Sequence, residues 1–406
     1  MVNSEVTQSD DPHSCGIGLA LSGGGSRAIA FHLGCLRALH EAGILERVDV
    51  ISAVSGGSVI AAMYVYSDDS FGSFDKRVCE LLRKGIQGNI LSRFLRLDLL
   101  FGSICTTLIA GTCAVLVDSA RTVMTALWKK FAKTRGQMPA WLAKMYSPIP
   151  RWVSRTNALE RILDQRVFND IRMESVRRNN MDIVINACEL RTATAFRFGS
   201  RESSSWRFGK IDGNDVKVSR AVAASAAYPI LLPALDVEFL FELKSGDKER
   251  KRVVLTDGGI YDNLGTTCLE PGRSADFTFN VFHPKHIVCC YAGHGQLDDA
   301  GVPYWWPSRQ IRVTGATFKR AQDASMGRLH EFVKHGEIDS FVLAYLGQQD
   351  SKLLDLPSDF VPREKVASYP TDFAPMTEED IRLLTSRGEQ LTRLHLSRYA
   401  QKLLKE

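Results

Sequence analysis

The chain has 406 residues, of which 45% are hydrophobic and 24% are charged, and its formal net charge is +5. This length and apolar content are enough to bury one large core or two moderate ones. Because the charge is modest and the sequence has no RNP, helix-turn-helix or zinc pattern, we expect no nucleic-acid partner.

Residues 1–15 are polar and mildly acidic, and they contain no apolar stretch, so we expect no Sec-type signal peptide there. Nine cysteines are present, an odd number without a C-x-x-C pair, and several lie inside apolar runs. This pattern favours reduced thiols in a cytoplasmic protein over disulfides. No H-E-x-x-H motif or His/Asp cluster occurs, so we expect neither a metal nor another cofactor.

The first motif is a glycine-rich turn after the apolar run Ile17–Leu21, with the sequence Ser22-Gly23-Gly24-Gly25-Ser26-Arg27. A helix is predicted over Ser26–Ala42. The unit also matches a loose G-x-G-x-x-A dinucleotide pattern, but that fold needs an acidic residue at the end of the next strand. Asp49 instead lies at the start of the next apolar run. Taken alone, this motif fits a dinucleotide loop and an oxyanion loop equally well.

The second motif is the bend Ser55-Gly56-Gly57 between a predicted strand, Val48–Val54, and a predicted helix, Ser58–Tyr66. A serine at such a strand-to-helix bend is typical of a nucleophile elbow, which needs small neighbours because the serine backbone is strained. Gly57 supplies the small residue after the serine. Ala53 stands where the G-x-S-x-G pattern has its first glycine, which is a departure from the pattern.

The third motif is Asp257-Gly258-Gly259 at the end of the apolar run Val253–Leu255, with Asn263-Leu264-Gly265 after it. A stretch of small residues, Ser219–Pro229, precedes it. Together with the first two motifs, these elements resemble the patatin-like phospholipase family in both content and order. The resemblance covers residues 16–267, about two thirds of the chain.

The resemblance implies a Ser-Asp dyad, with Ser55 as nucleophile and Asp257 as general base, and no cofactor. Backbone N–H groups at the start of the first helix would stabilise the oxyanion, aided by the helix dipole. The predicted donors are Gly24, Gly25 and Ser26, and the supporting motif residues are Gly23, Arg27, Gly57, Gly258 and Gly259. Arg27 is predicted either to orient the loop or the substrate head group, or to be a surface cation.

His294 is the best histidine alternative to Asp257 as base, because it follows the apolar run Ile287–Tyr291 and could lie at a strand end. A strand-end histidine that only hydrogen-bonds to backbone is the commoner case, so the dyad is preferred. Apolar runs at Met181–Cys188 and Ile287–Tyr291 add two strands to the three motif strands. The expected fold is therefore α/β, a three-layer α/β/α arrangement with a mainly parallel central sheet.

Residues 99–117 form an uncharged stretch of nineteen residues, just long enough to span a bilayer as a helix. A single crossing would separate Ser55 from Asp257, and basic residues flank both ends, namely Lys76, Arg77, Arg83, Lys84, Arg93 and Arg96 before it and Arg121, Lys129, Lys130, Lys133 and Arg135 after it. We expect peripheral or dipping membrane contact through 99–117 and the basic, aromatic stretch that follows. The alternative is a core helix or a lid over the acyl pocket.

Three parts are expected: a polar tail at 1–15, a catalytic domain at 16–270 with an insertion at about 72–165, and an extension at 271–406 packed on that domain. Within the extension, Thr377–Glu406 is predicted to be an amphipathic helix with Thr377 as its cap.

The predicted protein is a cytoplasmic, membrane-associated serine lipid acyl hydrolase of the phospholipase A or lysophospholipase type, which cleaves fatty acyl esters. A lipid transacylase is an alternative, because it would share the acyl-enzyme and differ only in the acceptor. A catalytically weak lipid-binding scaffold is the other, because Ala53 and Ala28 occupy glycine positions of the family.

Overall fold

The computed structural model describes residues 13–86, 97–131, 138–143, 145–178, 180–229, 231–275, 278–295 and 302–405. Most of the predicted polar tail, residues 1–12, lies outside these ranges. Four of the predicted flanking cations, Arg93, Arg96, Lys133 and Arg135, also lie outside them.

The described helices are α1 (Gly25–Glu41), α2 (Gly56–Val65), α3 (Phe71–Lys84), α5 (Leu97–Phe131), α6 (Ala140–Ala143), α7 (Arg155–Leu163), α8 (Val218–Ser225), α9 (Gly259–Asp262), α10 (Trp306–Lys334), α11 (Glu378–Tyr399) and α12 (Gln401–Lys405). The strands are β1 (Ser14–Leu21), β2 (Val50–Val54), β3 (Asp182–Glu189), β4 (Thr194–Gly199), β5 (Ser203–Ser205), β6 (Gly209–Ile211), β7 (Leu235–Glu242), β8 (Lys248–Asp257), β9 (His283–Tyr291) and β10 (Ser340–Tyr345).

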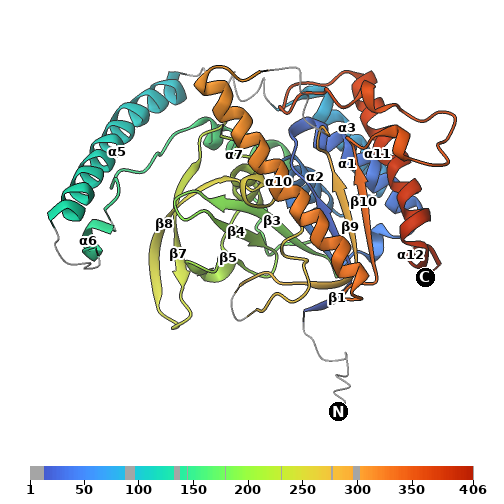
Figure 1. The fold of residues 1–406 in the computed structure, drawn as a ribbon, viewed down its shortest axis with the longest axis horizontal. Helices are drawn as coiled ribbons and strands as arrows, with labels where there is room; N and C mark the ends of the chain where they lie inside the picture. Colours follow the sequence, from blue (N-terminus) through green and yellow to red (C-terminus); the bar gives the residue numbers. More distant parts are fainter. Residues whose placement is uncertain are drawn as a thin grey trace, which may run out of the picture.

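The strands form one sheet in the order β10-β9-β1-β2-β3-β4-β5-β6-β7-β8, and β8 pairs back onto β3. Six of the ten pairings among the described strands are antiparallel, and the circuit from β3 to β8 closes on itself as a barrel. The predicted three-layer α/β/α fold with a mainly parallel central sheet is therefore wrong. The structure instead has a closed antiparallel barrel sheet with a helical part (Figure 1).

The physical reason for this error is that apolar runs reveal only strands buried on both faces. Parallel pairing is confined to β10, β9, β1, β2 and β3, which carry such runs. Other barrel strands lack them, since β5 consists of three serines and β8 begins with Lys248-Glu249-Arg250-Lys251-Arg252. Their hairpin connections are antiparallel, and antiparallel sheets alternate polar and apolar residues.

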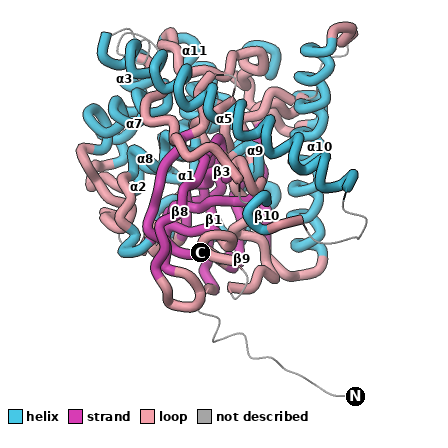
Figure 2. Tube along the Cα trace, turned by 90° about the vertical axis from the view of Figure 1, so that its left-hand side faces the viewer, coloured by secondary structure: helices cyan, strands magenta, loops and turns pink. Residues whose placement is uncertain are grey.

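The first two strand-helix units form where the sequence predicts them, as β1 with α1 and β2 with α2. Figure 2 shows the strands in the middle of the molecule, with α2 and α8 on one side and α10 on the opposite side. Thr377 caps α11 as predicted, because its hydroxyl accepts from the N–H of Asp380 at 3.1 Å. The predicted helix breaks at Ala400, however, and α12 follows.

Helices α1 and α11 cross backbone to backbone at two glycines. A Cβ on Gly34 would lie 1.9 Å from the carbonyl oxygen of Thr385, and one on Gly388 would lie 2.2 Å from that of Phe31. Strands β9 and β10 also join the sheet beside β1. On these contacts we propose that residues 271–406 are an extension packed on a catalytic domain at 16–270.

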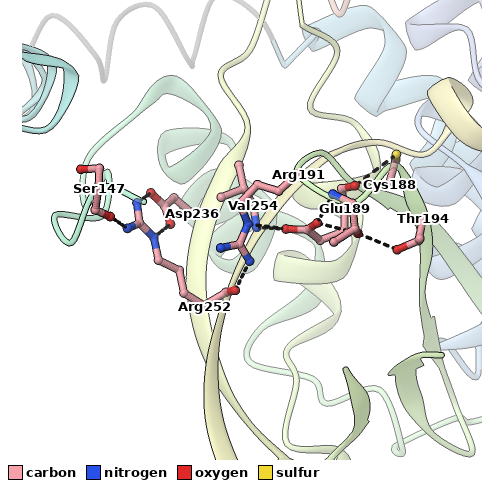
Figure 3. A network of polar contacts seen from close by, with 9 residues as sticks. Ser147, Cys188, Glu189, Arg191, Thr194, Asp236, Arg252 and Val254 are labelled. Carbon is pink, nitrogen blue, oxygen red and sulfur yellow. Dashed lines mark hydrogen bonds and ion pairs between the residues drawn. The ribbon is translucent and has the colours of Figure 1, made fainter. Parts of the chain in front are cut away.

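A polar network fixes the segment that returns from the α5 insertion (Figure 3). Both oxygens of Asp236 on β7 accept from Arg252 on β8, each at 2.6 Å, and both side chains are about nine-tenths buried. Arg252 also donates to the carbonyl oxygens of Ser147 and Ile149, while Asp236 accepts from the N–H of Arg151 at 2.8 Å. The insertion therefore re-enters the body at a defined place on the β7–β8 hairpin.

We predict that Asp236→Ala lowers the free energy of unfolding by about 3–5 kcal/mol, because it leaves the Arg252 cation buried without its partner. Urea denaturation of the two proteins measures this difference. Glu238→Ala, an exposed acid on the same strand, is the control and should change stability little. Equal effects of the two substitutions would show that the buried pair has no special role.

Candidate active site

The glycine-rich loop after β1 is held by backbone contacts on both sides. The N–H of Ser22 donates to Cys290 on β9, and the N–H of Gly23 donates to Asn263 after α9. Gly24 has φ +147° and Gly25 has φ +59°, conformations that favour glycine. A Cβ on Gly23 would lie 2.6 Å from Oδ1 of Asn263. The loop therefore needs its glycines for both conformation and space.

Ser55 lies in the sharp bend between β2 and α2 with φ 49° and ψ −120°, a backbone conformation that a non-glycine residue rarely adopts. The glycines after it allow the bend to touch the first loop. A Cβ on Gly56 would lie 2.3 Å from the carbonyl oxygen of Gly25, and one on Gly57 would lie 2.5 Å from that of Leu21. This strained serine at a strand-to-helix bend has the geometry of a nucleophile elbow.

Asp257 ends β8, and its carboxyl lies close enough to the Ser55 side chain for that group to lower its pKa. Its Oδ1 accepts from the N–H of Gly259 at 2.7 Å. Burial raises the pKa of Asp257 from 3.8 to about 6, although the Gly259 N–H and the Ser55 side chain act to lower it. The structure thus brings the first and third predicted motifs to the serine, although about two hundred residues separate Ser55 from Asp257 in sequence.

Ser225, the last residue of α8, hydrogen-bonds to the backbone at Ser55 and to the backbone next to Asp257. Its Oγ accepts from the N–H of Ser55 at 2.8 Å and donates to the carbonyl oxygen of Asn186 at 2.6 Å. Its own carbonyl oxygen accepts from the N–H of Gly258 at 3.2 Å. Two residues on, the carbonyl oxygen of Ala227 accepts from the N–H of Asp257 at 3.1 Å. One helix end therefore sets the positions of both Ser55 and Asp257.

Ser55 and Asp257 open into a pocket of about 370 Å³. Gly23, Gly24 and Gly25 form one wall of it. The other walls are largely apolar, and their large apolar and aromatic side chains are Tyr228, Leu231, Leu232, Ile260, Tyr291, Phe318 and Phe373. A largely apolar pocket with some polar groups suits a ligand with a hydrocarbon chain and a polar reacting group.

Arg27 is buried, with 3% exposure, so it is not the surface cation of the alternative prediction. It donates to the carbonyl oxygens of Ala292 at 2.9 Å and Tyr369 at 2.7 Å, and it also contacts His294. Burial lowers the pKa of Arg27 to about 10. Its position ties the glycine loop to β9 and to the C-terminal segment.

His294 lines the same pocket, but its ring contacts residues other than Ser55 and Asp257. It hydrogen-bonds to the carbonyl oxygen of Ala367 at 2.7 Å and contacts Arg27. Burial and the Arg27 cation lower the pKa of His294, which favours the neutral ring. Within the described ranges, no histidine ring hydrogen-bonds to Ser55 or Asp257.

The predicted oxyanion loop has one unexpected contact. The N–H of Ser26 donates to the carbonyl oxygen of Asp372 at 2.7 Å, so this donor is already engaged. The segment around Asp372 lies against the loop, and a Cβ on Gly25 would be 2.3 Å from the same oxygen. Gly24 and Gly25 therefore remain as the candidate backbone donors that line the pocket.

Three contributors to this site were not predicted from sequence: the Ser225 hydroxyl, the Asp372 segment and the α10 wall with Phe318. The sequence marks the stretch that contains Ser225 only by its small residues. Ser225 is a single polar residue with two alanines on either side, and this is the one feature of the sequence that could have indicated its role. Asp372 and Phe318 lie far along the chain from the glycine-rich loop and from the bend at Ser55, and no local sequence pattern indicates that they belong to the site.

Comparison with known proteins gives a family and several partial likenesses. A sequence profile of the patatin-like phospholipase family matches residues 19–268, more than half of the chain. The lysophospholipase nte1 of Aspergillus fumigatus is 51% identical over 57 residues, which are 14% of this chain and 4% of that protein. The chain therefore spans only a small part of the length of this curated relative.

Two solved structures give partial likenesses. Human GIVD cytosolic phospholipase A2 is 12% identical, with a TM-score of 0.49 over 96% of this chain and 62% of that one. VipD from Legionella pneumophila is 13% identical, with a TM-score of 0.36 over 97% of this chain and 67% of that one.

The burial of Asp257 makes a prediction about stability. Because its pKa is raised from 3.8 to about 6 in the folded protein, ionisation opposes folding, and this cost grows between about pH 4 and pH 6 to on the order of 3 kcal/mol. Asp257→Asn removes the cost, so the variant should gain stability over the wild type as pH rises through that window. Urea unfolding at about pH 4.5 and about pH 8 measures the gain.

Asp247→Asn, at an exposed turn position, controls for the lost formal charge. A stability difference between Asp257→Asn and the wild type that is the same at both pH values would contradict the raised pKa.

Proposed function

This chain belongs to the patatin-like phospholipase family, and from that premise we propose that it is a serine lipid acyl hydrolase of the phospholipase A or lysophospholipase type. The observation that carries the proposal is the strained Ser55 beside the buried carboxyl of Asp257, since both residues line one largely apolar pocket. The lysophospholipase name of the fungal relative agrees with it, although the match covers only 57 residues.

In the proposed reaction the carboxylate of Asp257 takes the proton of Ser55 while Oγ attacks the ester carbonyl carbon. The N–H groups of Gly24 and Gly25, at the positive end of α1, stabilise the oxyanion. When the C–O bond of the ester breaks, the leaving alcohol takes the proton from Asp257 and the acyl chain stays on Ser55. Water then gives its proton to Asp257 and attacks the acyl carbon. As the bond from that carbon to Ser55 Oγ breaks, Asp257 returns the proton to Oγ and the fatty acid leaves.

The pKa of Asp257 supports its role as base. A general base works best when its pKa lies near the operating pH, and burial places this carboxyl at about 6. In this proposal the apolar pocket has two roles, because it accommodates the acyl chain and its burial of Asp257 raises the pKa of the base.

Membrane contact is the second part of the proposal. The described chain contains one helix with the length and composition to cross a bilayer, Phe101–Lys130, and only 11% of its apolar window is buried. Figure 1 shows α5 standing away from the body. None of its residues lines the pocket at Ser55, so the lid alternative has no support. We propose that α5 lies in or dips into the lipid, which keeps Ser55 and Asp257 on one side of the membrane.

A second exposed apolar surface supports contact with a membrane near the pocket. Tyr304, Trp305 and Trp306 at the start of α10 are 87%, 74% and 70% exposed. Further along the same helix, Phe318 lines the pocket. Tryptophan and tyrosine are favoured at the lipid interface, so this helix would place the pocket near the bilayer. The nine free cysteines are typical of the reducing cytoplasm, and we propose the cytoplasmic face.

The nucleophile is tested by covalent labelling. Ser55→Ala should abolish labelling by a fluorophosphonate and lower hydrolysis of a lipid panel by several orders of magnitude, as expected when a nucleophile is removed. Ser58→Ala is the matched control. Ser58 lies in the first turn of α2, directly after the bend, and its hydroxyl donates to the carbonyl oxygen of Ser55 at 2.6 Å. Labelling that persists in Ser55→Ala would refute the assignment, and no labelling of the wild type would favour a lipid-binding scaffold.

Ser225→Ala tests the anchor. Loss of the hydroxyl frees the Ser55 N–H, and a displacement of the nucleophile should reduce kcat by about 10- to 100-fold with little change in KM. Ser219→Ala is the control, because it removes a hydrogen bond to Asp164 elsewhere on α8. Comparable kcat values for both variants would show that α8 acts only through general stability.

The membrane contact is tested by changing Leu108 and Ile109, which are 62% and 51% exposed on α5, to Asp. Charged residues in the hydrocarbon layer cost about 2.5–3.5 kcal/mol each, so binding to anionic vesicles should fall sharply while cleavage of a soluble ester is kept. Leu190→Asp, at an exposed site on the body, controls for lost surface hydrophobicity. Unchanged vesicle binding in the α5 variant would exclude this helix as the contact.

A further inference from the structure

A second pocket, of about 290 Å³, lies on the other side of α9 from the pocket at Ser55. Its walls come from β4 and β5, from Tyr261 of α9 and from the segment that follows α9. Ile260 lines the first pocket and Tyr261, the next residue, lines the second. The one-turn helix after Asp257 is therefore a shared wall.

Arg197 forms the floor of the second pocket. It is 3% exposed, and its hydrogen bonds to other described residues go to neutral oxygens: Thr267 Oγ1 at 3.1 Å, Thr278 Oγ1 at 3.3 Å and the carbonyl oxygen of Phe279 at 3.0 Å. Its Nε has no hydrogen-bond partner among the described residues. The buried carboxyl of Asp262 interacts with Arg197 electrostatically, without a hydrogen bond between them among the described residues. An anion bound beside the guanidinium would supply the direct charged partner and offset the cost of its burial.

A second arginine lines the same pocket. Arg273 pairs with Glu270 at 3.1 Å through Nη2, and its Nε is buried without a described partner. Glu270 also pairs with Arg328 at 2.7 Å, so one carboxylate serves two guanidiniums. The nearby carboxylate of Asp262 accepts from the N–H groups of Gly265 and Thr267.

Among the described residues in these contacts, three arginines (Arg197, Arg273 and Arg328) accompany two acids (Asp262 and Glu270). Ser204 is directly opposite Arg197 in the β4–β5 register, on the same face of the sheet, and its hydroxyl lines the pocket. At the rim, Trp206 and Tyr261 are about half exposed.

We propose that this pocket binds a phosphate group, with Arg197, Arg273 and Ser204 as its donors. Guanidinium N–H groups match the oxygens of phosphate in pairs, and a hydroxyl adds a third direction of donation. Trp206 and Tyr261 would contact the organic part of a phosphate ester. The site is separate from Ser55 and Asp257, so it goes beyond the proposed hydrolysis.

The pocket has a physical connection to the candidate active site. Arg197 donates to Thr267 Oγ1, and the N–H and side chain of Thr267 both hydrogen-bond to Asp262, the last residue of α9. A phosphate that draws the guanidinium of Arg197 toward itself would therefore act on the helix that follows Asp257.

The test is equilibrium binding of inorganic phosphate and glycerol 3-phosphate to the full chain, measured by calorimetry at constant ionic strength. We expect saturable binding to the wild type that weakens by about ten-fold or more in Arg273→Gln and in Ser204→Ala. Arg250→Gln removes an exposed arginine from β8 and should bind as the wild type does. Ser55→Ala should also bind normally, which separates this result from the fate of the proposed hydrolysis.

Vesicles of phosphatidylcholine with and without phosphatidic acid identify the source of the phosphate. A soluble phosphate ester is supported if the protein binds glycerol 3-phosphate and if its binding to vesicles is the same in the wild type and in Arg273→Gln. Phosphatidic-acid binding that falls in Arg273→Gln and Ser204→Ala, but not in Arg250→Gln, supports a lipid head group. If neither the soluble phosphates nor the vesicles distinguish these variants from Arg250→Gln, the proposal is overturned and Arg197 only ties the segment after α9 to the sheet.

Discussion

The hydroxyl of Ser225 connects the parts of the candidate active site. It receives the N–H of Ser55, and it donates to Asn186 on β3, the strand on which the parallel and antiparallel parts of the sheet meet. The backbone beside it receives the N–H groups of Asp257 and Gly258. A strained serine keeps its conformation only where its surroundings fix it, and here one helix end fixes both the serine and the aspartate.

The position of β8 depends in turn on a buried acid. Glu189, at the end of β3, is 0% exposed and accepts from the N–H of Val254 on β8 at 3.1 Å and from Arg191 at 2.8 Å (Figure 3). Three residues further along β8, no cation among the described residues offsets the burial of Asp257, and its pKa rises to about 6. Paired polar groups thus secure the strand, while the proposed catalytic carboxyl lies in an environment that opposes its charge. Such a division is expected where function conflicts with stability.

The predictable and unpredictable parts of the fold differ in their physical basis. Gly25 and Gly57 could be found from sequence because backbone sterics allow nothing larger at these contacts, and the bend that they permit pointed to Ser55. The closed barrel could not be found, because β5 and the first half of β8 are polar and their pairing is set by neighbours distant in sequence. The engagement of Ser26 by Asp372 likewise depends on where the C-terminal segment folds back.

The central claim is that Asp257, and no histidine, activates Ser55. The rate of fluorophosphonate labelling as a function of pH tests it most directly, because the inhibitor reacts with the activated serine without a lipid surface. The account predicts a rate that rises through a single titration near pH 6, the pKa of the buried carboxyl, and that becomes slow and independent of pH in this range in Asp257→Asn. A wild-type profile retained by Asp257→Asn, or one lost in His294→Ala while Asp257→Asn still reacts, would contradict it.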